Sequence, residues 1–458
     1  MTWVPTGLRV RRTSSARVGA VALFAAGLQG ALVIAACGAA TEPPAGLSTD
    51  AAATLDARAG EGGDARQDAP HDAHDAYLDA YLDAGHVTDA SVASLASLAD
   101  AADAGPPPQA PCQRPTADLG VRSDACLARL ALAGRDLPYY RSHGLESTDA
   151  AVENLVLIQH GNSRNAWDYY DTVAAAATLR DSGRTAVLAP LFQASNSTCG
   201  FDAKAPNDLY WGCSDWKEGG VSRNATIDSY AALDALLAAA KVAFPRLRRV
   251  TIAGYSAGGQ TIQRYLAGNT EHDRTPGITT RYVVASPGSY MYLDGRRVRP
   301  DAVCTSASNC ALTAASFVLP PYAGSACQTD EPAVEPGGDA YDDYRYGLAN
   351  RTGYLAAIPD ATLRANTVAR PVVYVLSEGD AAAAGARPVA YGALDKSCAA
   401  MAQAPLGASY RLQRGLVYHQ YVTSLFGAAH RRRIVPVCGH EEGCVLTDPG
   451  TRDELFGP

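Results

Sequence analysis

Ser256, in the pentapeptide Gly254–Gly258 (Gly-Tyr-Ser-Ala-Gly), has the sequence surroundings that most clearly suggest chemistry. The apolar run 249–253 before it predicts a strand and 260–266 after it predicts a helix, so the serine lies on a sharp turn that exposes its hydroxyl. Glycines on both sides fit such a turn, because side chains there would collide. A serine hydroxyl is a weak nucleophile until a neighbouring base removes its proton. The alternative interpretation is that Ser256 only caps the helix.

The elements that would hold Ser256 alternate between strands and helices from about residue 150 onward. Strands are predicted at 154–159, 185–189, 249–253, 281–285, 371–376 and 433–437, and helices at 226–243, 260–266 and 411–426. Continuous apolar strands separated by helices predict an α/β fold with a doubly wound, mainly parallel sheet. Reactive groups should then lie at the carboxyl ends of the strands.

Over about residues 150–458 the sequence resembles the α/β-hydrolase superfamily, in particular its serine esterases and lipases. That resemblance implies a nucleophile, an acid and a histidine in this chain order, each after a strand. Ser256 matches the nucleophile, and His440, after the last predicted strand, matches the base. The acid should follow strand 371–376, where Asp380 is preferred because Gly379 permits a turn, and Glu378 is the alternative. Taken singly, His440 could be a structural loop residue and Asp380 a solvated turn residue.

Two backbone N–H groups are expected to form an oxyanion hole for the acyl-transfer reaction. Ala257 supplies one by its position after the nucleophile. The loop after strand 154–159, which resembles the family's His-Gly turn, should supply the other from Asn162, with Gly161 as the second choice. We interpret His160 in this loop as a buried histidine that braces the loop and does not react.

The chain has 11 cysteines, of which ten lie within residues 112–444. An even number of cysteines in an exported domain predicts disulfides. Short spacings suggest the pairs Cys112–Cys126, Cys199–Cys213, Cys304–Cys310 and Cys438–Cys444, which leaves Cys327–Cys398. A zinc site at Cys438, His440 and Cys444 is the alternative, disfavoured because no Cys-x-x-Cys accompanies it and an oxidising compartment disfavours free thiolates.

The amino terminus has the features of an export signal. Four arginines precede the apolar run 18–36, which ends in Ile-Ala-Ala-Cys37 and resembles the lipobox of bacterial lipoproteins. That resemblance implies cleavage of a signal peptide, residues 1–36, and acylation of Cys37. A permanent anchor is the alternative, since about 18 apolar residues can just span a bilayer.

Residues 37–110 are predicted to be a disordered, Ala/Asp-rich tether. Residues 38–110 contain eleven Asp, two Glu, two Arg and no Lys, a net charge of −11 in a chain of net charge −8. The histidines and aspartates of residues 71–83 could form a metal cluster, but a solvated stalk explains them better. No broad basic surface is available for nucleic acid, which we therefore exclude as a partner.

The domain 111–458 contains a long insertion, about residues 287–370, before the acid-bearing strand, where the resemblance implies a cap over the nucleophile. The sequence therefore predicts an exported, membrane-anchored serine hydrolase, at the outer membrane or cell surface, that cleaves carboxylic esters through an acyl-enzyme. Its expected partners are a small or polymeric ester substrate and a lipid membrane reached through acylated Cys37, and no metal or organic cofactor is implied. The alternatives are a serine peptidase or amidase, and a non-catalytic binding lipoprotein on the same scaffold.

Overall fold

The computed structural model describes residues 109–194, 205–274, 276–306, 309–320, 341–381, 394–405 and 409–457, all within one unit of the chain that spans residues 69–458. The predicted signal peptide, Cys37, the histidines and aspartates of residues 71–83 and the tether up to residue 108 lie outside the described residues.

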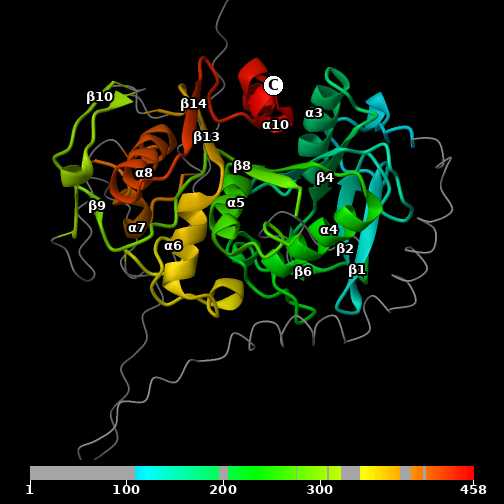
Figure 1. Cartoon of the computed structure of the whole chain (residues 1–458), viewed down its shortest axis with the longest axis horizontal. Coiled ribbons are helices and arrows are strands. Elements are labelled where there is room, and N and C mark those ends of the chain that lie inside the picture. The colour runs from blue at the N-terminus through cyan, green and yellow to red at the C-terminus, as the bar shows by residue number, and fades with distance from the viewer. Residues whose placement is uncertain are drawn as a thin grey trace, which may run out of the picture. The chain divides into compact units, whose positions relative to one another are not determined.

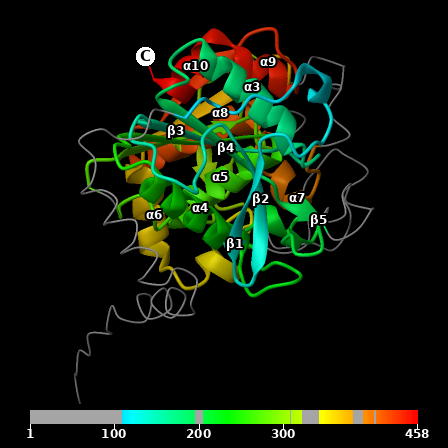
Figure 2. The same ribbon diagram turned by 90° about the vertical axis from the view of Figure 1, so that its right-hand side faces the viewer.

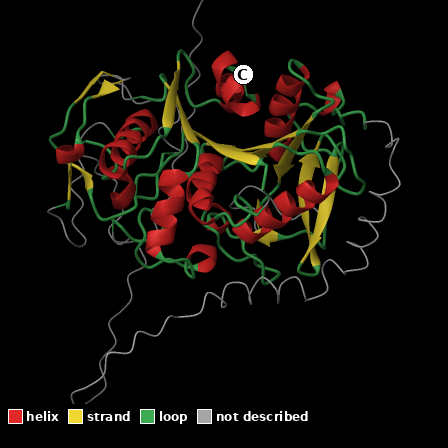
Figure 3. Ribbon diagram, in the orientation of Figure 1, coloured by secondary structure: helices red, strands yellow, loops and turns green. Residues whose placement is uncertain are grey.

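A mixed sheet of eight strands forms the centre of the described residues (Figures 1 and 3), in the order β1-β2-β4-β3-β7-β8-β13-β14. These strands are β1 (Leu127–Leu132), β2 (Arg135–Arg141), β3 (Asn154–Gln159), β4 (Thr185–Pro190), β7 (Arg249–Tyr255), β8 (Thr279–Ala285), β13 (Val372–Ser377) and β14 (Arg431–Val435). β1 pairs antiparallel with β2, and β2 antiparallel with β4. From β4 to β14 every pairing is parallel.

Helices cover both faces of this sheet (Figures 1 and 2). One face carries α3 (Ala166–Thr178), α9 (Glu442–Thr447) and α10 (Pro449–Phe456), and the other carries α4 (Ser229–Ala243), α5 (Ala257–Gly268), α6 (Asp360–Ala369) and α8 (Arg411–Phe426). In β3, Leu155 and Leu157 join the core cluster on the second face while Val156 and Ile158 join the cluster on the first. Successive side chains of a strand point to opposite faces, so burial of both faces explains the continuous apolar run. The predicted α/β, doubly wound, mainly parallel fold is confirmed.

Short elements occupy the long connections. The loop after β4 contains β5 (Gln193–Ala194), β6 (Tyr210–Trp211) and a 3₁₀ turn, η3 (Asp215–Lys217). The described parts of the insertion contain β9 (Arg297–Val298), β10 (Cys304–Ser306), β11 (Asn309–Cys310), η4 (Ala314–Ser316), β12 (Phe317–Val318), η5 (Gly353–Leu355) and α6, and the remaining short helices are η1 (Thr116–Asp118) and α7 (Cys398–Met401). A cap formed by this insertion stays a prediction.

The predicted elements agree with the structure closely in the parallel part of the sheet. β3 and α8 have the bounds that the sequence predicted, whereas β14 begins and ends two residues before the predicted strand 433–437. Pro436 follows the strand, and Val437 has a φ of 70° and is 93% exposed, so the chain turns away where the apolar residues still continue. The hairpin β1–β2 and the helices α3, α9 and α10 were not predicted.

Three of the predicted disulfides are confirmed: Cys112–Cys126, Cys304–Cys310 and Cys438–Cys444. Cys213 and Cys398 are also disulfide-bonded, while their predicted partners, Cys199 and Cys327, lie outside the described residues. Among the helices that the structure describes, none combines the length and the apolar character needed to cross a membrane.

Candidate active site

Ser256 lies between the end of β7 and the start of α5, with backbone angles φ 57° and ψ −119°. Positive φ is unusual for a residue other than glycine and is strained, and here it turns the half-buried serine out of the strand direction. The flanking glycines are required by close approach of the backbone. A Cβ atom on Gly258 would lie 2.2 Å from the carbonyl oxygen of Gln159, and one on Gly254 would lie 2.3 Å from that of Gly258. The predicted strand-to-helix turn is therefore present.

His440 bridges the two other predicted residues. Its Nε2 lies 2.8 Å from Ser256 Oγ, and its Nδ1 lies 2.7 Å from Asp380 Oδ2. The imidazole is 11% exposed and the Asp380 side chain 2%. The strand order explains this convergence, because β7, β8, β13 and β14 are parallel neighbours, so the loops after them meet at one edge of the sheet.

The two candidate acids on the loop after β13 differ in their surroundings. Asp380 is buried and faces His440, whereas Glu378 is exposed. The Gly379 N–H donates to the carbonyl oxygen of Cys438 at 2.9 Å, and a Cβ on Gly379 would lie 2.7 Å from that oxygen. The two loops therefore meet backbone to backbone at Gly379, which gives this glycine a second reason to be present besides the predicted turn.

Two residues outside the predicted set contact Asp380 and His440. Arg411, the first residue of α8, is buried, and its Nη1 lies 3.4 Å from Asp380 Oδ1. The ring of Tyr255 stacks on the His440 imidazole with centroids 5.0 Å apart, and its Oη lies 3.1 Å from His440 Nδ1. Burial raises the pKa of the Tyr255 phenol, so this group stays protonated beside the histidine. Tyr255 lies inside the motif that identified Ser256, whereas nothing in the sequence near Arg411 indicates its contact.

The loop that carries His440 is constrained on both sides. Val437 is the central residue of a three-residue turn closed by the Cys438 N–H and the Pro436 carbonyl oxygen, 2.8 Å apart. The Cys438–Cys444 disulfide closes a ring around the histidine. Because both sulfurs are in that bond, they are not available as thiolate ligands for the alternative zinc site. Within the residues that the structure describes, no three or more side chains of His, Cys, Asp or Glu lie close enough together to hold a metal ion.

The candidate oxyanion donors lie beside the serine. Ala257 is the first residue of α5, a position whose N–H has no acceptor within the helix. Gly161 is buried, and a Cβ placed on it would lie 3.7 Å from Ser256 Cβ, whereas Asn162 is exposed. The loop after β3 and the start of α5 are therefore adjacent, as the prediction requires, and the role of their N–H groups stays a prediction.

His160 is fully buried, and both of its ring nitrogens bind the main chain. Its Nδ1 lies 2.8 Å from the carbonyl oxygen of Gly161, and its Nε2 accepts from the Phe192 N–H at 3.1 Å. The Trp216 ring packs on the imidazole with centroids 4.7 Å apart. Burial lowers the pKa of His160 to about 3, so the ring is neutral at ordinary pH. These contacts agree with the interpretation that His160 braces the loop.

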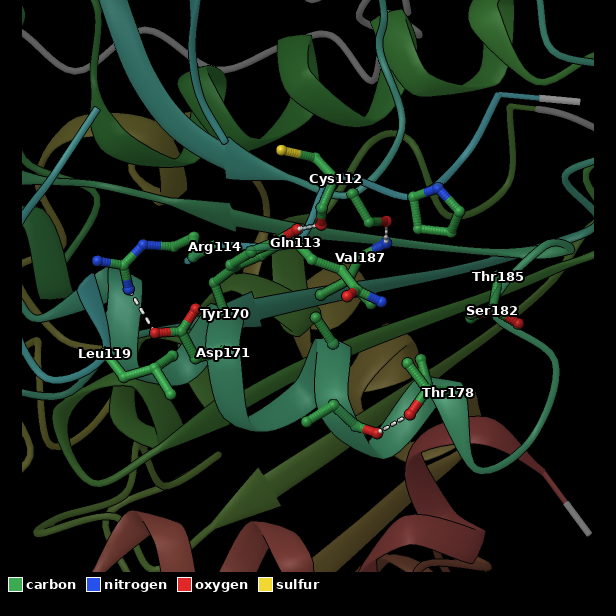
Figure 4. A pocket seen from close by; sticks show the side chains of 15 residues that line it. Cys112, Gln113, Arg114, Leu119, Tyr170, Asp171, Thr178, Ser182, Thr185 and Val187 are labelled. Atoms are coloured by element: carbon green, nitrogen blue, oxygen red, sulfur yellow. Dashed lines mark hydrogen bonds and ion pairs between the residues drawn. The ribbon is translucent and has the colours of Figure 1, made fainter. Parts of the chain in front are cut away.

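A cavity of about 270 Å³ lies between the segment 111–119 and α3, near Thr185 at the amino end of β4 (Figure 4). Its charged groups are paired within it, since Arg114 Nη1 binds Asp171. Thr178 in its wall donates to the carbonyl oxygen of Ala175 in its own helix. The candidate active site lies at the carboxyl ends of the strands, so this cavity is separate from it.

Among known proteins, the chain is similar only to solved structures, and no sequence-based match was found. The sequence matches no protein-family model and no curated protein. Among solved structures, the chain is similar to poly(aspartic acid) hydrolase-1 from Sphingomonas sp. KT-1, with 18% identity and a TM-score of 0.45 over 72% of this chain and 97% of that one. LpqC, a poly(3-hydroxybutyrate) depolymerase from Bordetella parapertussis, is 18% identical with a TM-score of 0.42 over 70% and 89% of the chains. Est1E from Butyrivibrio proteoclasticus is 15% identical with a TM-score of 0.33 over 72% and 96%.

Proposed function

We propose that the chain is a serine hydrolase that cleaves carboxylic esters through an acyl-enzyme, with Ser256 as nucleophile, His440 as base and Asp380 as the acid of the triad. The observation that carries this proposal is the continuous chain of hydrogen bonds in which His440 lies 2.8 Å from the serine oxygen and 2.7 Å from the carboxylate. The fold supports it, because the strand order presents all three loops at one edge of the sheet.

In the first half of the reaction, Ser256 Oγ attacks the ester carbonyl carbon while its proton moves to His440 Nε2. Asp380 accepts a hydrogen bond from Nδ1–H, which fixes the imidazole tautomer and stabilises the imidazolium that forms. The imidazolium then gives its proton to the departing alcohol, which leaves an acyl group on Ser256. In the second half, His440 takes a proton from a water molecule whose oxygen attacks the acyl carbon. The bond from that carbon to Ser256 Oγ then breaks, the imidazolium returns its proton to Oγ, and the carboxylic acid leaves.

The negative charge that develops on the carbonyl oxygen needs fixed donors. The N–H of Ala257 at the start of α5 and the N–H of Asn162 in the loop after β3 would supply them, with Gly161 as the alternative for the second. His160 acts on this step indirectly, because its bonds to Gly161 and Phe192 hold the loop against the sheet.

Labelling with a fluorophosphonate probe tests the nucleophile. The full chain should be labelled, and Ser256→Ala should abolish the labelling and the hydrolysis of p-nitrophenyl esters. Ser286→Ala is the matched control, because Ser286 also follows a parallel strand directly and has a positive φ, of 39°. A wild-type chain that is neither labelled nor active would favour a non-catalytic binding protein. Faster turnover of anilides than of esters of the same acid would instead favour a peptidase or amidase.

We also propose that the domain is exported and held at the outer membrane or cell surface through acylated Cys37. The disulfides support an oxidising compartment, since such bonds rarely persist in a cytosol. Metabolic labelling with an alkyne fatty acid tests the anchor in a bacterial host. The wild-type chain should be labelled and sediment with membranes, whereas Cys37→Ala should lose the label, and equal labelling of the two chains would contradict the anchor.

A further inference from the structure

Tyr169, in the first half of α3, presents its hydroxyl to the loop beside the candidate nucleophile. Only 2% of the residue is exposed. A Cβ atom on Gly161 would lie 2.5 Å from Tyr169 Oη and 3.7 Å from Ser256 Cβ, so the phenol and the serine face the same side of Gly161. Both distances start from one point, so Tyr169 Oη and Ser256 Cβ are within about 6 Å of each other. At that range Tyr169 Oη is close enough to donate to an oxyanion that forms on a carbon bonded to Ser256 Oγ, since a donor must lie about 3 Å from the oxyanion.

The chemistry of this hydroxyl suits a donor. Burial raises the pKa of the Tyr169 phenol well above its usual value, so the group carries its proton at any working pH. The neighbouring backbone of Gly161 offsets only part of that rise. The hydroxyl therefore has a proton to donate, and within the described part of the chain no residue accepts it.

We propose that Tyr169 Oη–H is a third donor to the oxyanion, beside the N–H groups of Ala257 and Asn162. This inference rests on the proposed function of Ser256. When the Ser256 Oγ–C bond forms, the electron pair of the carbonyl π bond moves to the carbonyl oxygen, and Tyr169 donates a hydrogen bond to it without giving up its proton. When the intermediate collapses, the π bond is restored, the bond to the leaving oxygen breaks, and the hydrogen bond from Tyr169 weakens.

Tyr170, the next residue of α3, offers a comparison, because its hydroxyl binds only backbone groups. Tyr170 lines the cavity between the segment 111–119 and α3 (Figure 4), and its hydroxyl donates to the carbonyl oxygens of Cys112 and Arg141. These bonds join α3 to the segment at the amino terminus of the domain and to the end of β2. The Tyr169 ring belongs to the core cluster on this face of the sheet, and phenylalanine would keep it there, so the hydroxyl serves a purpose that packing does not explain.

The variants Tyr169→Phe and Tyr170→Phe of the full chain test the proposal. For Tyr169→Phe we expect a loss of about 10- to 100-fold in kcat, a KM within about twofold, and an unchanged unfolding midpoint. Its affinity for an aryl trifluoromethyl ketone, which adds the serine oxygen and forms a stable oxyanion, should fall by the same factor as kcat/KM. For Tyr170→Phe we expect unchanged kcat and ketone affinity with a lower unfolding midpoint.

Two outcomes would overturn the proposal and leave the proposed function standing. In one, Tyr169→Phe keeps kcat within twofold of the wild type, which itself reacts with the fluorophosphonate. In the other, kcat falls while the ketone affinity stays constant, which would mean that Tyr169 acts only on the shape of the site. A wild-type chain that reacts with neither the fluorophosphonate nor the ketone would overturn both proposals together.

Discussion

Two histidines follow parallel strands at the same edge of the sheet, His160 after β3 and His440 after β14, and their surroundings differ in every respect that matters for proton transfer. Both ring nitrogens of His160 bind backbone groups, and the ring is fully buried. The ring of His440 is partly exposed and lies between a carboxylate and a serine hydroxyl. One ring is locked into the main chain, and the other links two side chains.

This difference shows that residue type and position after a strand do not identify a base. The proton of an imidazole is available for catalysis only where one nitrogen faces a group that can give up or accept a proton during the reaction. The Phe192 N–H at His160 Nε2 is not such a group, whereas the Ser256 hydroxyl at His440 Nε2 is. The substitutions below test whether the two loops are as different in function as in structure.

The largest effect is expected for His440→Gln. Glutamine can hydrogen-bond but cannot take a proton from Ser256, so ester turnover should fall by about 10⁴-fold or more. The unfolding midpoint in urea should change little, because the ring is partly exposed and lies in a surface loop. Turnover above about one hundredth of the wild-type value would contradict its role as the base.

Asp380→Asn should have the next largest effect, about 10⁴-fold in kcat, because an amide at this position no longer fixes the imidazole tautomer or stabilises the imidazolium. It also removes the anion beside Arg411. Glu378→Gln is the control on the same loop and should keep kcat within about twofold, since Glu378 is exposed. The opposite ranking of the two variants would assign the acid to Glu378.

Asp380 and His440 illustrate what the sequence could predict. Strand ends are readable from apolar runs, and the resemblance described above implies the chain order of the three side chains, so Ser256, Asp380 and His440 could be named as candidates. The contacts of Tyr255, Arg411 and Tyr169 could not, because they depend on how helices and loops pack around those strand ends and leave no local pattern in the sequence.

The hairpin β1–β2 was missed for a local reason. Its two-residue turn, Ala133-Gly134, has positive φ at both positions, a conformation that Asn-Gly or Asp-Gly usually signals. The strand Leu127–Leu132 is also half exposed, so its apolar residues form no continuous run. Pro138 inside β2 weakens the pattern further, since proline is rare within strands.

His160→Gln should mainly lower the free energy of unfolding, whereas His440→Gln should mainly lower turnover. Losing one of the two ring bonds should cost about 1–3 kcal/mol at pH 7.5, with turnover of the folded protein reduced by about 10-fold at most. The folded pKa of His160 is about 3, below its unfolded value of about 6.5, so the neutral ring stabilises the wild type fully above pH 6.5 and less as the pH falls.

In the wild type, unfolding below pH 6.5 lets the His160 imidazole take up a proton. The His160→Gln variant has no imidazole at this position and takes up no such proton. Its stability deficit against the wild type should therefore shrink as the pH falls from 6.5, by up to about 1.4 kcal/mol per pH unit. Urea unfolding followed by circular dichroism at pH 7.5, 6 and 5 measures this difference. A deficit that stays constant across this range would mean that His160 is not held neutral by its surroundings.

An effect on turnover far smaller than that of His440→Gln is expected from removal of the disulfide around His440. Replacing both Cys438 and Cys444 with serine should lower kcat by about 10-fold, because the loop that carries His440 loses the bond that keeps the imidazole positioned beside Ser256. The pair Cys304–Cys310 is a matched control, since both disulfides have a sequence separation of 6 and should restrict the unfolded chain similarly.

The control pair should therefore lower the unfolding midpoint by a similar amount and leave kcat unchanged. For the same reason, a mild reductant should lower the activity of the wild type before the domain unfolds. If the two serine pairs reduce kcat equally, the disulfide acts through overall stability. The loop that carries His440 would then be held by the strained turn at Val437 and by the backbone hydrogen bond between Gly379 and Cys438. Neither of these needs the disulfide.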